Sequence, residues 1–142
     1  MTELVIRVAA AATLIWLGMV LAISFLEAPL KFRAEDLDLR VGLAIGRIVF
    51  RALNIAEVGW AVLIAVCLAF AGASGPVLVL AVVTAVLLAV QLAVVRPRLN
   101  RRSTAVLAGQ DAPRSRAHHV YIGLEALKLA ALVALGAALL AA

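Results

Sequence analysis

Four long apolar stretches follow one another along the chain, separated by shorter polar segments. They cover about residues 4–28, 47–71, 76–95 and 119–141. Each reaches the ~20 residues that a helix needs to cross a hydrocarbon core about 30 Å thick. Ten-residue segments of alternating polarity, which are typical of membrane β-strands, do not occur. The pattern predicts an all-α, polytopic membrane protein, a single domain over residues 1–142 with four transmembrane helices in an up-down bundle.

Turn and capping residues set the expected limits of these helices. Pro29 predicts an end or a kink in the first helix. Asp38 is a candidate N-cap for a helical pattern that continues into the second span. Because this pattern is longer than a bilayer core, we expect residues 39–46 to be interfacial or a separate short helix. Residues 72–76 predict a tight turn, and residues 96–116 predict a basic loop, partly disordered or interfacial.

Composition and charge support a membrane protein and suggest its orientation. The chain has 142 residues, 66% of them apolar, and a formal net charge of +5. The basic residues gather in the first and third loops, whereas the second loop and the C-terminal tail have none. The positive-inside rule therefore predicts that both loops are cytoplasmic and both termini outside. We expect these loops to bind anionic lipid headgroups rather than nucleic acid. The first apolar run is long enough to be a retained span rather than a signal peptide.

Polar side chains with one shared spacing mark the second and fourth spans. At 100° per residue, each set falls on one stripe of its helix. The two stripes consist of Arg47, Phe50, Asn54 and Glu57, and of His118, Tyr121, Glu125 and Lys128. Both helices enter the membrane from the same side, and Glu57 and Lys128 each lie ~15 Å beyond the start of their stripe. We therefore expect the two stripes to meet.

The first span adds a third wall to this predicted site. If the helix continues through Pro29, then Glu27 and Lys31 share one face and can pair. Gln91 on the third span is a candidate for a fourth wall. An ionisable side chain in hydrocarbon costs ~2.5–3.5 kcal/mol and usually marks a functional site. We predict a polar cleft that faces the cytoplasm and is lined by Glu27, Lys31, Arg47, Asn54, Glu57, His118, Tyr121, Glu125 and Lys128.

The same residues allow a purely structural interpretation. Three acidic and three basic side chains in this set could form an ion-pair network that only fixes the register of the helices. A metal site is not predicted, because cations are interleaved with the carboxylates, and His118 and His119 point about 100° apart on a helix. Trp16 and Trp60 are interpreted as packing or interfacial aromatics. No catalytic or cofactor-binding motif occurs, so no catalytic residue or cofactor is predicted and a non-enzymatic role is favoured.

Residues 18–50 resemble a known family. Gly18 in the first span is expected to permit close helix contact. It is followed by Ala28-Pro29-x-x-Phe32 and by Gly42-x-x-x-Gly46-x-x-x-Phe50. This arrangement resembles the small four-span bacterial membrane proteins of an uncharacterised domain family, whose eukaryotic relatives are associated with tolerance to platinum drugs. The resemblance implies a four-helix bundle of the bacterial inner membrane and no assigned reaction.

A second resemblance lies at the start of the second span. Arg51-Ala-Leu-Asn54-Ile-Ala-Glu57 is similar to a signature of the membrane glutathione-transferase and leukotriene-synthase family, with one residue fewer between the arginine and the asparagine. This resemblance implies glutathione at a trimer interface, with Arg51, Asn54 and Glu57 in the site.

Three functional hypotheses follow. The first is a small inner-membrane protein that handles a small solute or ion, or confers tolerance to one, through the polar cleft. The second is a glutathione-dependent membrane enzyme that acts on lipophilic substrates. The third is an accessory subunit of a larger membrane complex. Because a monomer of this size would make only a thin pore, we expect a homo-oligomer or a membrane-complex partner.

Overall fold

The computed structural model describes residues 1–111 and 116–142, and over these residues it is helical without any strand. The elements are α1 (Thr2–Val20), η1 (Leu21–Glu27), α2 (Ala28–Lys31), α3 (Leu39–Ala71), α4 (Pro76–Val90), η2 (Gln91–Val95), α5 (Arg96–Leu107) and α6 (Arg116–Leu140). Because η1 and η2 are π-helical turns inside longer helices, the described residues form four continuous helices. Each is long and apolar enough to cross a membrane.

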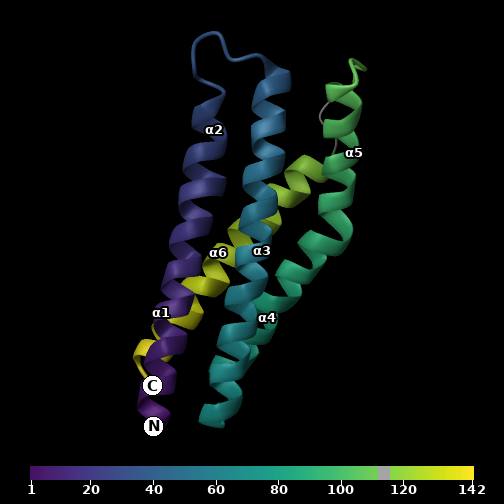
Figure 1. The fold of residues 1–142 in the computed structure, drawn as a ribbon. Helices are drawn as coiled ribbons and strands as arrows, with labels where there is room; N and C mark the ends of the chain where they lie inside the picture. Colours follow the sequence, from purple (N-terminus) through teal and green to yellow (C-terminus); the bar gives the residue numbers. More distant parts are fainter. Residues whose placement is uncertain (112–115) are drawn as a thin grey trace.

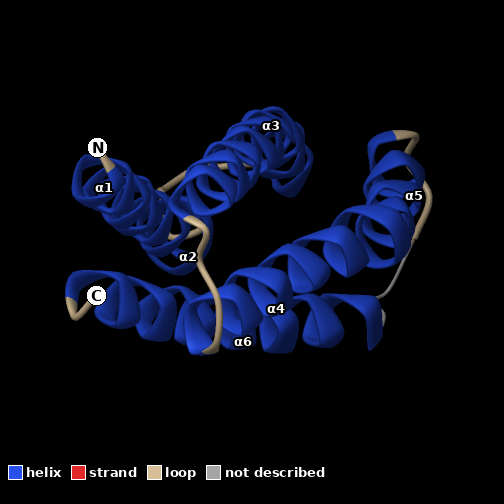
Figure 2. Cartoon of the chain, turned by 90° about the horizontal axis from the view of Figure 1, so that it is seen from below, coloured by secondary structure: helices blue, strands red, loops and turns tan. Residues whose placement is uncertain are grey.

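The four helices form the predicted up-down bundle. Helix α1 packs against α3 and α6, and α4 packs against α6. Both chain termini lie at one end of the bundle, and the loop between α2 and α3 lies at the other (Figure 1). Seen from the end with the termini, α1 and α3 lie side by side, and α4 lies against α6 (Figure 2). The outward faces remain apolar, as at Phe70, which is 79% exposed. The fold is thus that of a multi-pass membrane protein.

Two π-helical turns let the first and third helices run through prolines. Pro29 and Pro97 each follow a π segment after a single intervening residue. A proline in a helix lacks an N–H group and clashes with the carbonyl group four residues earlier. In both helices that carbonyl lies within the wider π turn, which relieves the clash. Of the end or kink predicted at Pro29, the end does not occur, because the helix continues to Lys31.

Other predicted boundaries had mixed outcomes. Asp38 caps α3, its carboxylate accepting a hydrogen bond from the Arg40 backbone N–H at 3.1 Å. Residues 39–46 are not a separate helix, because α3 is unbroken from its first residue. The turn at residues 72–76 is confirmed, with Gly72 and Gly75 both at positive φ. The loop predicted after residue 95 was wrong for α5, while residues 112–115 of that loop lie outside the described part.

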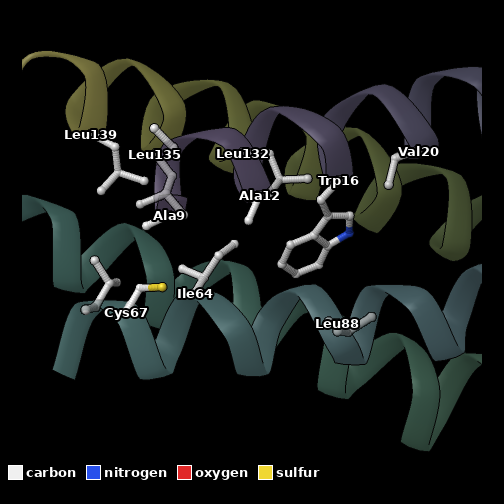
Figure 3. Close-up of a cluster of buried hydrophobic side chains, with 12 residues drawn as sticks. Ala9, Ala12, Trp16, Val20, Ile64, Cys67, Leu88, Leu132, Leu135 and Leu139 are labelled. Atoms are coloured by element: carbon white, nitrogen blue, oxygen red, sulfur yellow. The ribbon is translucent and has the colours of Figure 1, made fainter. Parts of the chain in front are cut away.

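The hydrophobic core fills the half of the bundle nearest the termini. It consists of Ala9, Ala10, Ala12, Trp16, Val20, Ile64, Cys67, Leu68, Leu88, Leu132, Leu135 and Leu139. Small alanines on α1 let it approach α3 and α6 closely. Figure 3 shows Trp16 beside this cluster, with its indole nitrogen pointing away from Cys67 and Leu139. The ring thus marks the boundary between the aliphatic core and the polar atoms beyond it.

Three glycines differ in how closely other residues pack against them. A Cβ atom added at Gly136 on α6 would lie 3.3 Å from Leu14 on α1, so this glycine sits at a close helix contact. One added at Gly42 would lie 2.5 Å from the ring of Phe32, which covers it. One added at Gly18 would meet nothing within 4 Å. The close contact predicted for Gly18 was therefore wrong, because that position faces open space.

This difference predicts opposite effects for two matched substitutions. Gly136→Leu should lower the free energy of unfolding by ~1–3 kcal/mol, because the side chain overfills the contact between α1 and α6. Gly18→Leu should have no destabilising effect, because the side chain enters open space. Thermal unfolding of the two purified variants in one detergent measures the difference. Equal stability of the two variants would contradict the packing of α1 on α6.

Candidate functional site

A fully buried lysine stands at the centre of the candidate site. Lys128 of α6 has 0% exposure, and its ammonium group is in contact with three other buried side chains. It donates hydrogen bonds to the Glu57 carboxylate of α3 and, at 2.8 Å, to the Gln91 side-chain oxygen. It also forms an ion pair at 3.1 Å with Glu125, one turn earlier on α6. The ammonium group therefore has three partners, one for each of its protons.

A second layer of donors completes the partners of both carboxylates. The Trp16 indole N–H donates to Glu57 Oε1 at 3.0 Å, and the Ser24 hydroxyl donates to Glu125 Oε1 at 2.8 Å. The Gln91 amide donates to Glu125 Oε2. All four membrane helices therefore contribute to one network. We call the following residues the polar cluster: Trp16, Ser24, Glu57, Gln91, Glu125 and Lys128.

The polar cluster lies deep between the two ends of the bundle. At about 1.5 Å per residue, the following residues lie ~18–22 Å from the helix ends nearest the termini: Trp16, Glu57, Gln91 and Lys128. A hydrocarbon core is ~30 Å thick, so the cluster falls within it when the apolar helices span a bilayer. The aliphatic core fills the side toward the termini. The same cluster residues lie ~18–27 Å from the helix ends on the side of the basic loops, so the cluster is near the middle of the bundle.

The charges of the cluster do not balance. Two carboxylates share one ammonium group, so the fully ionised cluster carries one net negative charge. Glu57 and Glu125 are each only 1% exposed, and no water competes for their charge. Burial of an uncompensated charge in a medium of low polarity is costly. The remaining negative charge can be balanced by the Arg96 guanidinium, which interacts electrostatically with both carboxylates, or by a bound proton or other monovalent cation.

An aromatic and cationic layer covers the cluster on the basic side. The rings of Phe50 and Tyr121 meet edge to face, with their centroids 6.1 Å apart. The Arg96 guanidinium lies 4.8 Å from the Phe50 centroid and 5.7 Å from that of Tyr121, within the range of cation–π contacts. Lys31 lies 5.9 Å from the same Phe50 ring. Positive charge is therefore held directly above the cluster that carries the negative charge.

The structure joins some of the predicted site residues and separates others. Contact between Glu57 and Lys128 is confirmed, as is the pairing of Glu27 with Lys31 at 3.6 Å. The second oxygen of Glu27 is buried without a hydrogen-bond partner among the described residues.

The other predicted residues lie around this centre. Tyr121 lies in the covering layer. Arg47 and Asn54 line a groove on the outer side of α3, away from the cluster. His118 is half-buried, with its ring 5.9 Å from that of His119. The site is a closed cluster rather than a cleft lined by all nine predicted residues.

Sequence reasoning missed several members of the site. Trp16 was assigned to packing, yet it donates a hydrogen bond to Glu57. Ser24 was overlooked because a lone hydroxyl in a span commonly bonds to its own helix. Arg96 was assigned to a loop, although it lies half-buried in a helix. Depth in the membrane was the available signal, because Trp16, Gln91 and Glu57 lie at similar distances from the helix ends nearest the termini.

The two halves of the chain repeat one helix pair. Pro29 precedes Glu57 by the same number of residues as Pro97 precedes Glu125. The offset that separates Glu57 from Glu125 also separates Ile64 from Leu132 and Cys67 from Leu135, all of which are buried. Each half contains a span with a π turn before its proline, and then a span that carries a buried carboxylate. Glu57 and Glu125 are thus equivalent residues that meet where the halves join.

Comparison with known proteins returns no relative. No protein-family model, curated protein or solved structure matches the chain.

The residues behind the glutathione-enzyme resemblance do not share one surface. Arg51 is exposed and Asn54 lines the outer groove, whereas Glu57 points into the bundle and binds Lys128. Among the described residues, no three His, Cys, Asp or Glu side chains are grouped so that they could hold a metal ion. Protonation and hydrogen bonding are therefore the chemistry that these side chains can supply on their own.

Removal of the central ammonium group should destabilise the bundle. Lys128→Met leaves two buried carboxylates without their cation, so we expect a loss of ~3–5 kcal/mol in the free energy of unfolding. Adding Glu57→Gln and Glu125→Gln to this variant should recover most of the loss, because no buried charge then remains. Thermal unfolding in detergent measures both effects. Wild-type stability of the single variant would contradict the ion-pair assignment.

Proposed function

We propose that this protein handles a small solute or ion in a bacterial inner membrane, and that the polar cluster is the site where a proton or monovalent cation binds during that process. The observation that carries the proposal is the ratio of two buried carboxylates to one ammonium group in the described network. A network that only fixes the register of the helices needs no more carboxylates than cations. The additional carboxylate gives the cluster a place for a cation that can enter and leave.

The position of the cluster supports the same proposal. In transporters built from repeats, coupling ions bind where the repeats meet, next to discontinuities in the membrane helices. Here α1 and α4 run in the same direction, so the repeat is parallel. Its two carboxylates meet at the junction of the halves, and both π turns lie beside Glu125, which accepts hydrogen bonds from Ser24 in η1 and from Gln91 at the start of η2. Such turns can rearrange their hydrogen bonds more readily than a regular helix.

We further propose that the cluster exchanges protons or ions with the cytoplasm. The basic loops would face that side by the positive-inside rule, with both termini outside. Entry would require Arg96 to move from its place over Phe50 and Tyr121. The guanidinium would thus act as a movable plug, held by the two aromatic faces and by its attraction to the carboxylates of Glu125 and Glu57.

Proton flux into proteoliposomes tests this function. The purified chain is reconstituted into liposomes that contain a pH-sensitive dye, and a potassium gradient with valinomycin supplies the driving potential. Wild-type protein should raise the proton permeability several-fold above that of empty liposomes. Glu57→Gln and Glu125→Gln should each return it to the background, because each removes a titratable group from the cluster.

Glu3→Gln provides the matched control. Glu3 pairs with Arg7 on the exposed N-terminal end of α1, so this variant removes a carboxylate without touching the cluster. It should conduct like the wild type. If the Glu57 and Glu125 variants retain full flux at equal reconstitution, the cluster only fixes the register of the helices, as expected for an accessory subunit. Absence of flux in the wild type, with protons or with potassium, would overturn the proposed ion handling.

A further inference from the structure

A groove opens along one seam of the bundle, on the outer side of the polar cluster. It lies between α3 and the η2–α5 part of the third membrane helix and has a volume of about 700 Å³. Its lining is formed by Arg47, Ile48, Arg51, Asn54, Ile55, Val58, Leu92, Arg96 and Asn100. The corresponding seam between α1 and α6 is packed closely at Gly136, where an added Cβ atom would lie 3.3 Å from Leu14. The groove is therefore a departure from the repeat that relates the halves.

Polar and apolar residues divide the groove along its length. Three arginines and two asparagines, together with Ile48, occupy the part toward the basic loops, and none of the described lining residues is acidic. Neither Arg47 nor Arg51 forms an ion pair with the described residues, and both are exposed. Ile55, Val58 and Leu92 continue the groove toward the end with the termini. This lining is basic at one end and aliphatic at the other.

The aliphatic half leads toward a second cavity in the same seam. This cavity, about 300 Å³ in volume, lies between α3 and α4 and is lined mainly by alanine and larger aliphatic residues. Its lining includes Ala61, Ala65, Val82 and Trp16. At about 1.5 Å per residue, Ala61 is ~15 Å along α3 from Arg51. An acyl chain that starts at the arginines would reach this depth.

We propose that the groove is a binding site for an anionic membrane phospholipid. The phosphate group is held by Arg47, Arg51 and Arg96, and one acyl chain follows the aliphatic wall toward the second cavity. Charge complementarity selects the headgroup, because an Arg guanidinium binds phosphate oxygens in a bidentate manner. The aliphatic end selects a membrane lipid over a soluble phosphate. Arg96 also covers Phe50 and Tyr121, so a lipid bound there contacts the layer above the cluster.

Quenching of tryptophan fluorescence by brominated lipids tests the proposal. The chain contains two tryptophans, so a Trp60→Phe background leaves Trp16 as the reporter. Trp16 is 2% exposed and lines the second cavity, so lipid that does not enter the seam has little access to it. The protein is reconstituted in phosphatidylcholine with a small, equal fraction of either brominated phosphatidylglycerol or brominated phosphatidylcholine. Brominated phosphatidylglycerol should quench Trp16 more strongly.

Arginine variants connect this preference to the groove. Arg51→Gln should lower the relative affinity for phosphatidylglycerol on the order of fivefold, the effect of one basic residue at an anionic lipid headgroup. Arg98→Gln is the matched control, because Arg98 is exposed on α5 but does not line the groove. It should keep the wild-type preference. Circular dichroism of each variant establishes that the helices are retained.

Four outcomes would overturn the proposal. Equal quenching by the two brominated lipids would show that the groove does not select an anionic headgroup. An equal loss in the Arg98 and Arg51 variants would assign the preference to the general charge of this membrane face. Loss of the preference on addition of inorganic phosphate would identify a soluble anion as the occupant. Quenching by neither lipid, together with chemical cross-linking of dimers, would show that a second copy of the chain covers the seam.

Discussion

The bundle depends on one buried ammonium group held between two carboxylates. Lys128 has no exposure, so protein atoms must supply everything that water would have supplied to its charge. Glu57 and Gln91 approach it from two other helices, and Trp16 and Ser24 of the first span hold the carboxylates in turn. No helix can slide or rotate without leaving a buried polar atom unpaired. In a membrane, where apolar packing distinguishes poorly between helix registers, this requirement selects one arrangement.

The same requirement explains why the helices with prolines are not simply broken. Both π turns place polar or charged side chains next to the cluster, Gln91 at the start of one and Ser24 within the other. A π turn widens the helix and shifts the direction of every following side chain. It thereby brings Arg96 over the rings above the cluster, while the helix continues through Pro97. Backbone irregularity and side-chain chemistry thus occur together in both halves of the chain.

The sequence predicted most of this fold and the centre of the site, for identifiable reasons. Apolar length defines a span, and helical spacing places Glu57 and Lys128 at matching depth, so their contact could be inferred. The helix beyond residue 95 could not, because Pro97 and a series of arginines are typical of a loop, and only the π turn makes a helix possible there. The hydrogen bond from Trp16 to Glu57 could not be predicted either. An indole packs equally well in lipid or protein, and only the tertiary fold turns its N–H toward Glu57.

The two equivalent seams between the halves of the repeat differ in how closely their helices pack. The seam between α1 and α6 is packed closely by alanines and Gly136, whereas the seam between α3 and the helix from α4 to α5 contains both cavities. In a symmetric bundle both seams would be packed equally, and movement of either half would break the same contacts. With one seam packed and the other open, the helix from α4 to α5 has less apolar contact with α3 to lose than α1 has with α6. Gln91 and Arg96 both belong to that helix, so they would move together in the proposed cation exchange. Such movement would break the hydrogen bonds of Gln91 to Lys128 and Glu125, so the proposed exchange would have to supply other partners for these buried groups.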